Sequence, residues 1–279
     1  MCTPEGDAMP ANADDSQGTP ARKAVHEDRV PRRRTKGRRS HKAAVEIAQL
    51  IVDDITDDRL APGTRLQSER DMVARFEVGR GTLRESLRFL EMSGVLTMKA
   101  GPQGGPFVAD PDAHDLAGSL GLFLQLRAVP FSQIIAAREI LEPELAGRAA
   151  VGATEEIRDL IADSIAGMEA FLDNDENFRA ENDRFHAAVA TAAGNDLFTL
   201  LIVSLHQITD GMPLGVSYSI ENRAAVLKAH ITIADAIRAG DPEGARWAMR
   251  RHMREFHEFV KRRYPEAYER PVKWRDVAQ

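Results

Sequence analysis

The stretch that decides the fold is Gly79–Gly94, GRGTLRESLRFLEMSG. Its arginines, Arg80, Arg84 and Arg88, are four residues apart, so in a helix they lie along one side, where like charges repel. Such a row is tolerated when something anionic lies opposite it. The anion is a carboxylate elsewhere in the fold, a small ligand or a polyphosphate.

The elements around this stretch favour a polyphosphate. The preceding residues include a segment with helical apolar periodicity, HKAAVEIAQLIVDDI, and a second helix, SERDMVARF, that starts at the N-cap Ser68. After Gly94, the segments VLTMKA and FVAD flank the glycine-rich GPQGGP, which predicts a β-hairpin. Three helices followed by a hairpin is the order of a winged helix-turn-helix, so the sequence predicts DNA as the anion.

On this interpretation the Gly79–Gly94 helix enters the major groove. Arg80 and Arg84 then reach guanine edges, because a guanidinium can bond to N7 and O6 together. Further expected DNA contacts come from the same helix and from the preceding helix start: Gly81, Thr82, Arg65 and Arg70. The apolar face is expected to pack on the first two helices: Leu83, Leu87, Leu90 and Met92. The alternative is a solvated helix face with ion pairs such as Glu85–Arg88.

The rest of the chain is expected to be helical. Apolar periodicity and the breaks between segments predict seven helices, near 113–126, 131–150, 155–173, 175–193, 196–210, 219–239 and 242–263. Short connections predict antiparallel neighbours in a bundle. The fold class is therefore mainly α, with a winged helix-turn-helix at 41–110 and an all-α domain at 111–265. Residues 1–40 are expected to be a disordered basic tail and residues 266–279 a frayed C-terminal tail.

Composition limits the function classes. The 279 residues have a net charge of −6, so any nucleic-acid site must be a local patch. The single cysteine, Cys2, excludes intrachain disulfides and thiolate metal clusters. The chain has no apolar run long enough for a membrane span and no signal peptide, so we expect a cytoplasmic protein with no membrane partner.

Four histidines fall within the predicted bundle: His186, His206, His230 and His252. A lone buried histidine is more often a hydrogen-bonded core residue than a ligand. Three from separate helices can nevertheless converge on a divalent metal, since such ions bind neutral imidazole. Asn182 is one helical turn before His186, so its amide oxygen faces the same side. Spacing alone leaves both readings open.

Residues 41–109 resemble the GntR-type winged helix-turn-helix. That family has the pattern PG-x-x-L-x-S-E-R, then R-x-x-V-R-E-A-L, L-x-x-x-G and a glycine-rich wing ending in F-V. The matching stretch of this sequence is PGTRLQSERDMVARFEVGRGTLRESLRFLEMSGVLTMKAGPQGGPFV. The resemblance implies DNA contacts by Arg70, Arg80, Thr82 and Arg84, with Gly104 and Gly105 at the wing tip. Gly79 departs from the usual serine, which removes one phosphate hydrogen bond or helix cap.

Residues 112–263 resemble the FCD effector domain of the FadR-like branch. The segments that carry the resemblance are AAREILEPELAGRAA, RAENDRFHAAVATAAGND, LKAHITIADAIRAGDPEGA and AMRRHMREF. It implies a divalent cation (zinc, nickel or manganese) bound by Asn182, His186, His230 and His252. Asn at the first position lacks the charge of the usual Asp, and Asp183 is a geometric alternative. His206 falls outside the pattern and is expected to line the pocket.

These observations predict a homodimeric, ligand-responsive transcription regulator, most often a repressor in this family, rather than an enzyme. Its partners are a palindromic DNA operator and a small organic acid, with Arg138 pairing with the acid or, alternatively, with Glu142 one turn away. The competing class is a metal-dependent hydrolase with a basic accessory domain. Such an enzyme needs a general base beside the metal, for which only Glu181 and Asp183 are near, and neither belongs to a recognisable motif.

Overall fold

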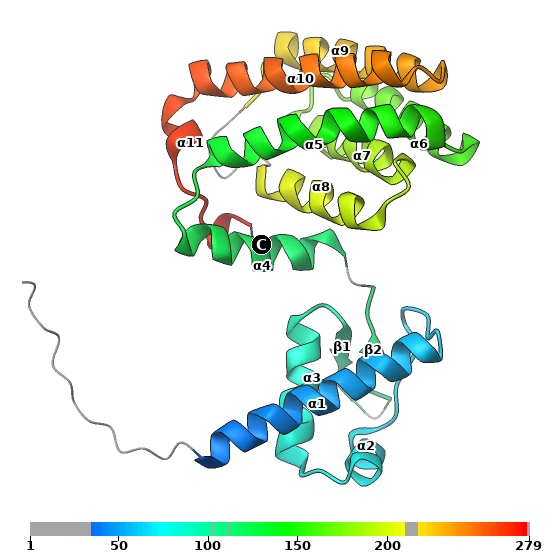
Figure 1. Cartoon of the computed structure of the whole chain (residues 1–279), viewed down its shortest axis with the longest axis vertical. Coiled ribbons are helices and arrows are strands. Elements are labelled where there is room, and N and C mark those ends of the chain that lie inside the picture. Colours follow the sequence, from blue (N-terminus) through cyan, green and yellow to red (C-terminus); the bar gives the residue numbers. More distant parts are fainter. Residues whose placement is uncertain (1–34, 102, 111, 210–216, 278–279) are drawn as a thin grey trace, which may run out of the picture.

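The computed structural model describes residues 35–101, 103–110, 112–209 and 217–277. They form a small winged domain and a larger helical bundle, joined by the segment that follows the second strand (Figure 1). The predicted fold class is confirmed, since both the winged helix-turn-helix and a bundle of about seven helices are present. No helix of the described residues is long and apolar enough to cross a membrane.

The winged domain is built from three helices and one hairpin. Its elements are α1 (Thr35–Asp57), α2 (Glu69–Phe76), α3 (Arg80–Met92), β1 (Leu96–Lys99) and β2 (Gly105–Val108). Ser68 caps α2 by accepting a hydrogen bond from the Asp71 amide at 3.3 Å. The strands pair antiparallel from Leu96 opposite Val108 to Lys99 opposite Gly105. The core of this domain joins all three helices and β1: Ile47, Ala48, Ile51, Met72, Leu83, Leu87, Leu90 and Leu96.

Two expectations for this domain differ from the structure. Met92 is 77 % exposed, although we expected it to pack with the leucines of α3. It is the last residue of the helix, past the turn that faces α1. The first helix begins at Thr35, inside the segment 1–40 expected to be a disordered tail. Lys36, Arg38 and Arg39 are good helix formers, so the helix begins before the expected start at His41.

The bundle consists of seven long helices whose bounds agree with the prediction to within a few residues. They are α4 (Ala113–Leu126), α5 (Phe131–Gly152), α6 (Glu155–Ala170), α7 (Asp175–Ala192), α8 (Asp196–Thr209), α9 (Ile220–Arg238) and α10 (Pro242–Arg263). Polar side chains just before the helices satisfy amide groups at six of the seven helix starts: Asp112, Thr154, Asn174, Asn195, Ser219 and Asp241. Such caps explain why these boundaries could be predicted.

The main core of the bundle lies between α5, α6, α7, α9 and α10. Phe185, Ile233, Met249 and Met253 are fully buried there. Helices α5 and α10 run along each other, and α7 packs on α5, α6 and α8 (Figure 1). This packing turns one face each of α5, α7, α8, α9 and α10 toward a common interior.

The prediction of a frayed C-terminal tail is wrong for the described residues. The chain forms α11 (Pro265–Glu269) and a short 3₁₀ turn, η2 (Trp274–Asp276), and both Val272 and Val277 are buried. The Phe131 amide donates to the Arg270 carbonyl at 3.1 Å, and the Val272 amide donates to the Val129 carbonyl at 3.0 Å. We call residues 265–277 the C-terminal segment. It has no helical periodicity, so its isolated apolar residues gave no packing signal in the sequence.

Candidate nucleic-acid interface and metal centre

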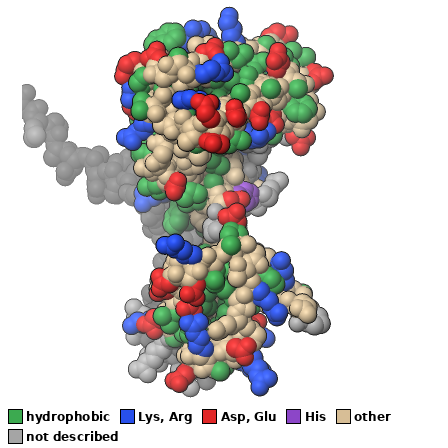
Figure 2. All heavy atoms as spheres, turned by 90° about the vertical axis from the view of Figure 1, so that its right-hand side faces the viewer, with side chains coloured by type: hydrophobic (Ala, Val, Ile, Leu, Met, Phe, Trp, Pro, Cys, Tyr) green, Lys and Arg blue, Asp and Glu red, His purple; other side chains and the backbone are tan. Residues whose placement is uncertain are grey.

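The exposed side of α3 is the candidate nucleic-acid interface. Arg80, Gly81 and Arg84 are exposed, and Thr82 is half-buried. Leucines at 83, 87 and 90 are buried on the opposite side, so they anchor the helix and orient the arginines outward. On the side of the molecule in Figure 2, Lys and Arg side chains are scattered over the winged domain among Asp and Glu.

The arginines of α3 form few intramolecular ion pairs. Arg84 Nε donates to Glu69 Oε2 at 3.0 Å, with both side chains partly exposed. Within the described ranges, Arg80 and Arg70 form no ion pair. The Glu85 carboxylate accepts from Nδ1 of His41 at 3.2 Å, a partner that the sequence did not suggest. An exposed pair such as Arg84–Glu69 contributes little to stability, so it is readily exchanged for a phosphate or a base.

Arg65 has a structural role in the wing. Its Nη2 donates to the Gly104 carbonyl at 2.8 Å, which ties the segment before α2 to the hairpin. Gly104 is required where it stands, because a Cβ there would lie 2.2 Å from the Lys99 carbonyl oxygen. Gly105 has a φ of +120°, which side chains rarely adopt. Gly104 thus ends the turn that begins at Gly101, and Gly105 starts β2 opposite Lys99.

In the bundle, three of the four predicted metal ligands converge. His186 on α7, His230 on α9 and His252 on α10 are buried, and one ring nitrogen of each lies within 4.8 Å of the others. Nε2 of His230 and Nε2 of His252 are 3.2 Å apart. Metal–nitrogen bonds of about 2.0–2.1 Å put ligands of one ion at such separations, so these residues fit a divalent cation.

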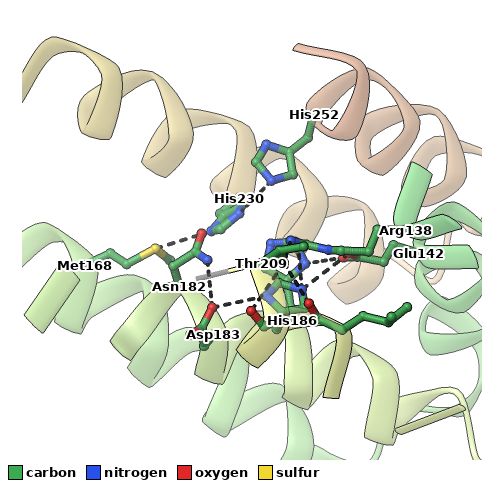
Figure 3. A network of polar contacts seen from close by, with 11 residues as sticks. Arg138, Glu142, Met168, Asn182, Asp183, His186, Thr209, His230 and His252 are labelled. Atoms are coloured by element: carbon green, nitrogen blue, oxygen red, sulfur yellow. Dashed lines mark hydrogen bonds and ion pairs between the residues drawn. The ribbon is translucent and has the colours of Figure 1, made fainter. Parts of the chain in front are cut away.

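The outer ring nitrogens of two of these histidines have defined partners. Nδ1 of His186 donates to the Glu142 carboxylate of α5, and Nδ1 of His230 lies 3.3 Å from the Met168 sulfur of α6 (Figure 3). A proton on Nδ1 leaves the lone pair on Nε2, which is the form that binds a metal. The fold therefore presets both rings for coordination through Nε2.

The electrostatics of the cluster keep the imidazoles neutral. Burial lowers the pKa of His186 to about 4, in spite of the nearby Glu142 carboxylate. Burial, reinforced by His186, lowers the pKa of His252 to about 3. Burial and the positive charge that His252 would carry hold the pKa of His230 well below its usual range. Neutral imidazole is the ligand form, so no proton must be removed near neutral pH before a metal binds.

Asn182 lines the same cavity, but its role as a ligand remains a prediction. Its amide nitrogen donates to Asp183 Oδ1 at 3.2 Å, and Figure 3 shows its oxygen on the side of His230. Asp183 in turn accepts from Nδ1 of His206 at 3.1 Å. The carboxylate of Asp183 is thus engaged with His206, whereas the Asn182 oxygen faces the histidine cluster.

Glu142, His186 and His206 form a second group with metal-like spacing. Arg138 donates from Nε to Glu142 at 2.7 Å and from Nη2 to Nε2 of His206 at 2.7 Å. A guanidinium is only a donor, so Nε2 of His206 must accept, and Nδ1 of His206 must donate to Asp183. Every ring nitrogen of His206 is therefore already paired. This second group is a hydrogen-bond network that supports His186, which agrees with the expectation that His206 lines the pocket.

Glu142 is ionised within this network. Burial alone would raise the pKa of Glu142, but Arg138, His186 and His206 together hold it well below its usual range. Arg138 also donates from Nη1 to Thr209 at 2.7 Å. Both readings of Arg138 are compatible with this geometry, since it forms the ion pair with Glu142 and also lines the cavity.

The cavity beside the histidines encloses about 50 Å³ and adjoins a second hollow of about 150 Å³. The two share Tyr218, Val226, His252 and Phe256. The smaller cavity has room for a metal ion and a few atoms of a ligand, while the hollow between α9 and α10 offers a route from the surface.

Several residues of the site were missed in the sequence. Met168, Thr209, Tyr218 and Phe256 gave no chemical signal, because their role depends on how five helices are rotated about their axes. Glu142 was identified only as a partner of Arg138. Its contact with His186 joins α5 to α7, and the one clue in the sequence was an acidic residue between the apolar residues Leu141 and Leu145.

Comparisons with known proteins agree with this geometry. Residues 43–108 match the family described as "Bacterial regulatory proteins, gntR family", and residues 133–255 match the "FCD domain". The first range covers the winged domain from α1 to β2, and the second contains Arg138 and all four predicted metal ligands.

Curated relatives extend the match over most of the chain. The "HTH-type transcriptional repressor NanR" of Citrobacter rodentium is 31% identical over 199 residues, which is 68% of this chain and 75% of that protein. The protein of the same name from Escherichia coli K12 is 29% identical over 250 residues, 87% of this chain and 92% of that protein.

A solved structure titled "Streptococcus agalactiae GntR" has the same fold. It superposes with a TM-score of 0.61 at 23% identity, and covers 77% of this chain and 99% of that one. The matched family is one of regulatory proteins, so the competing prediction of a metal-dependent hydrolase is not supported. The chain belongs to the GntR family of regulatory proteins and carries an FCD domain after its winged helix-turn-helix.

Proposed function

We propose that this protein is a homodimeric transcriptional repressor of the bacterial cytoplasm, which binds a palindromic operator through α3. A small organic acid, bound beside a divalent metal in the bundle, releases it from DNA. The observation that carries the proposal is the convergence of three buried, neutral histidines beside a cavity that also contains Arg138. The relatives named as transcriptional repressors support repression rather than activation.

DNA recognition is assigned to the exposed residues of the winged domain. Arg80 and Arg84 would contact guanine edges, with Gly81 allowing close approach and Thr82 contacting phosphate or a thymine methyl. Arg70, in the first turn of α2, would contact a phosphate, while Gly104 and Gly105 would bring the wing close to the duplex. Arg65 would act chiefly by fixing the wing, given its bond to Gly104.

The metal would be held by His186, His230 and His252, with Asn182 as the weakest ligand. Three imidazoles without a carboxylate ligand favour zinc or nickel over manganese. The ion would supply a positive charge and an open coordination position at the cavity. Glu142 and Met168 would hold the rings in their ligating orientation.

Charge balance supports an anionic ligand. A divalent ion and Arg138 carry three positive charges at this cavity, against two negative charges on Asp183 and the adjacent Glu142, while Arg179, which also lines the cavity, is paired with Asp175. The remaining positive charge, in a site largely shielded from water, favours a carboxylate. Within the described residues Arg138 uses three of its five N–H donors, so one on each terminal nitrogen is left for the acid.

The proposal can be tested with the purified full-length chain. Operator DNA is first selected from random duplexes, and the bound metal is identified by elemental analysis. Organic acids are then screened by thermal shift, and those that raise the melting temperature are added to the protein–operator complex. Release by an acid with metal-loaded protein, and not after chelation, supports the proposal. If no stabilising acid changes operator binding, the proposed mechanism is wrong.

A further inference from the structure

Helix α4 is the first bundle element after the winged domain, and it is held at both ends. Near its start, the Ala113 carbonyl accepts from Ser204 Oγ of α8 at 2.8 Å. Near its end, Gln125 Oε1 accepts from the Trp274 amide of the C-terminal segment at 2.7 Å. Helix α8 also carries His206, so one support of α4 comes from an element that lines the pocket.

The C-terminal segment reinforces the second support by close packing. Val277 lies against Gly121 of α4, where an added Cβ would be 3.2 Å from Val277 Cγ2. Val272 and Val277 belong to one buried cluster with residues of α4, α5 and α8: Ala117, Ile134, Leu205 and Ile208. Figure 1 shows this segment running from the end of α10 to the side of α4.

The same segment is fixed to the helix that carries His252. On α10, Nδ1 of His257 bonds to Glu139 Oε2 of α5 at 2.7 Å, and its Nε2 to the Tyr268 hydroxyl at 2.6 Å. These bonds tie α11 to α10 and α5. The C-terminal segment thus connects a helix of the metal site with the far end of α4.

The other end of α4 contacts the recognition domain. Gly94, which follows α3, has a φ of +71°, and a Cβ there would lie 2.1 Å from the Asp115 carboxylate. The first turn of α4 therefore lies against the C-terminal end of α3. A change in the position of α4 is expected to move the arginines of α3.

We propose that Gln125, Gly121 and Val277 are positioning residues for operator recognition, which set the half-site spacing that the dimer accepts. A dimer of winged domains binds two half-sites only at a separation that matches its own geometry. With the C-terminal segment released, the end of α4 is held less firmly and the two recognition helices span a range of separations. This inference rests on the proposed dimeric operator binding, but it concerns residues remote from both DNA and metal.

The test compares the double variant Gln125→Ala and Val277→Ala with Lys273→Ala. Lys273 is an exposed residue of the same segment and serves as the matched control. The DNA is an operator selected with wild-type protein, together with versions in which the half-site spacing is one base pair longer or shorter. Wild type and Lys273→Ala should prefer the selected spacing, and this preference should fall about fivefold or more in the double variant.

A second measurement keeps the test independent of general destabilisation. Amide hydrogen exchange of residues 113–126 in the free protein should accelerate in the double variant, while residues 220–238 of α9 remain as protected as in wild type. Unchanged exchange in α4, or an unchanged spacing preference, overturns the positioning role. If wild type itself binds no specific DNA or is a monomer, the proposed function is wrong. If wild type binds its operator as a dimer and the double variant behaves like it, only the positioning role is wrong.

Discussion

The Nε2 atoms of His230 and His252 lie 3.2 Å apart, although the two residues belong to different helices. Nδ1 of His230 is directed to the Met168 sulfur, so its proton resides there and Nε2 carries a lone pair. A neutral His252 either donates its Nε2 proton to this lone pair or, with its proton on Nδ1, directs a second lone pair to the same point. Burial holds the pKa of both rings below the usual range, so both imidazoles stay neutral, which is the form that binds a divalent cation.

We therefore expect one divalent ion per chain, lost in His230→Ala and in His252→Ala. Elemental analysis of the purified proteins, followed by zinc titration calorimetry of metal-free protein, measures this. His114→Ala, which removes an exposed histidine outside the cluster, should keep full occupancy. A wild type without metal that also shows no response to zinc, nickel or manganese in thermal melts would make the histidines ordinary core residues.

Replacing Asn182 by Asp should increase metal affinity, because a carboxylate adds a negative charge to a ligand set that is otherwise neutral. The matched variant is Asp183→Asn, one position out of register, which removes the negative charge beside His206 but no proposed ligand. Zinc affinity should rise in the first variant and change much less in the second. The opposite pattern would identify Asp183 as the ligand in place of Asn182.

The metal-free protein should lose stability as pH falls below about 6.5. The pKa of His186 is about 4 and that of His252 about 3 in the folded chain, against an ordinary value of 6.5. Between these values the unfolded chain binds protons that the folded chain does not, so lowering the pH favours unfolding. Each such histidine contributes a slope of up to about 1.4 kcal/mol per pH unit in this window.

Urea unfolding of metal-free protein at several pH values from 7.5 to 5 measures this slope. Substitution of His252 by Gln should make the slope smaller, and the exposed-residue variant His114→Gln should leave it unchanged. A slope that is the same in wild type and His252→Gln contradicts the depressed pKa of His252.

Arg80→Ala and Arg84→Ala should each weaken binding to the selected operator by about 1–3 kcal/mol, the value of one bidentate base contact. The fold should be retained, because both side chains are exposed. Arg88→Ala is the control on the same helix. If Arg88 meets a phosphate, its loss weakens specific and nonspecific DNA alike. Gel shifts in which both Arg80→Ala and Arg84→Ala discriminate operator from random DNA like wild type would contradict this assignment.

Much of the fold could be predicted because its signals are local. The N-caps Asn174 and Asp241 can be recognised from the residues next to them in the chain. The order of elements in the winged domain follows from the spacing between Arg80 and the glycines of the wing. The C-terminal segment could not be predicted, since Val272 and Val277 are buried only by residues far away in the sequence.

The same distinction applies to the site. His186, His230 and His252 were predicted as ligands because they match a family pattern, whereas spacing alone favoured ordinary core histidines over a metal site. The contact between Glu142 and His186 depends on which face of α5 packs against α7. The residues near Glu142 in the sequence do not determine this packing. Asn182 was predicted from the family register in preference to Asp183, and only the structure shows that Asp183 is bonded to His206.

The central claim is that a carboxylate bound at the metal releases DNA, and thermodynamic linkage tests it most directly. The affinity of the acid found by screening is measured by calorimetry for free protein and for the protein–operator complex, and the operator affinity is measured with and without the acid. We predict that operator DNA weakens acid binding by the same factor by which the acid weakens operator binding. Arg138→Ala and His230→Ala should reduce both factors toward one, while operator affinity without the acid stays nearly unchanged. An acid that binds free and DNA-bound protein equally, or variants that respond like wild type, would contradict the account.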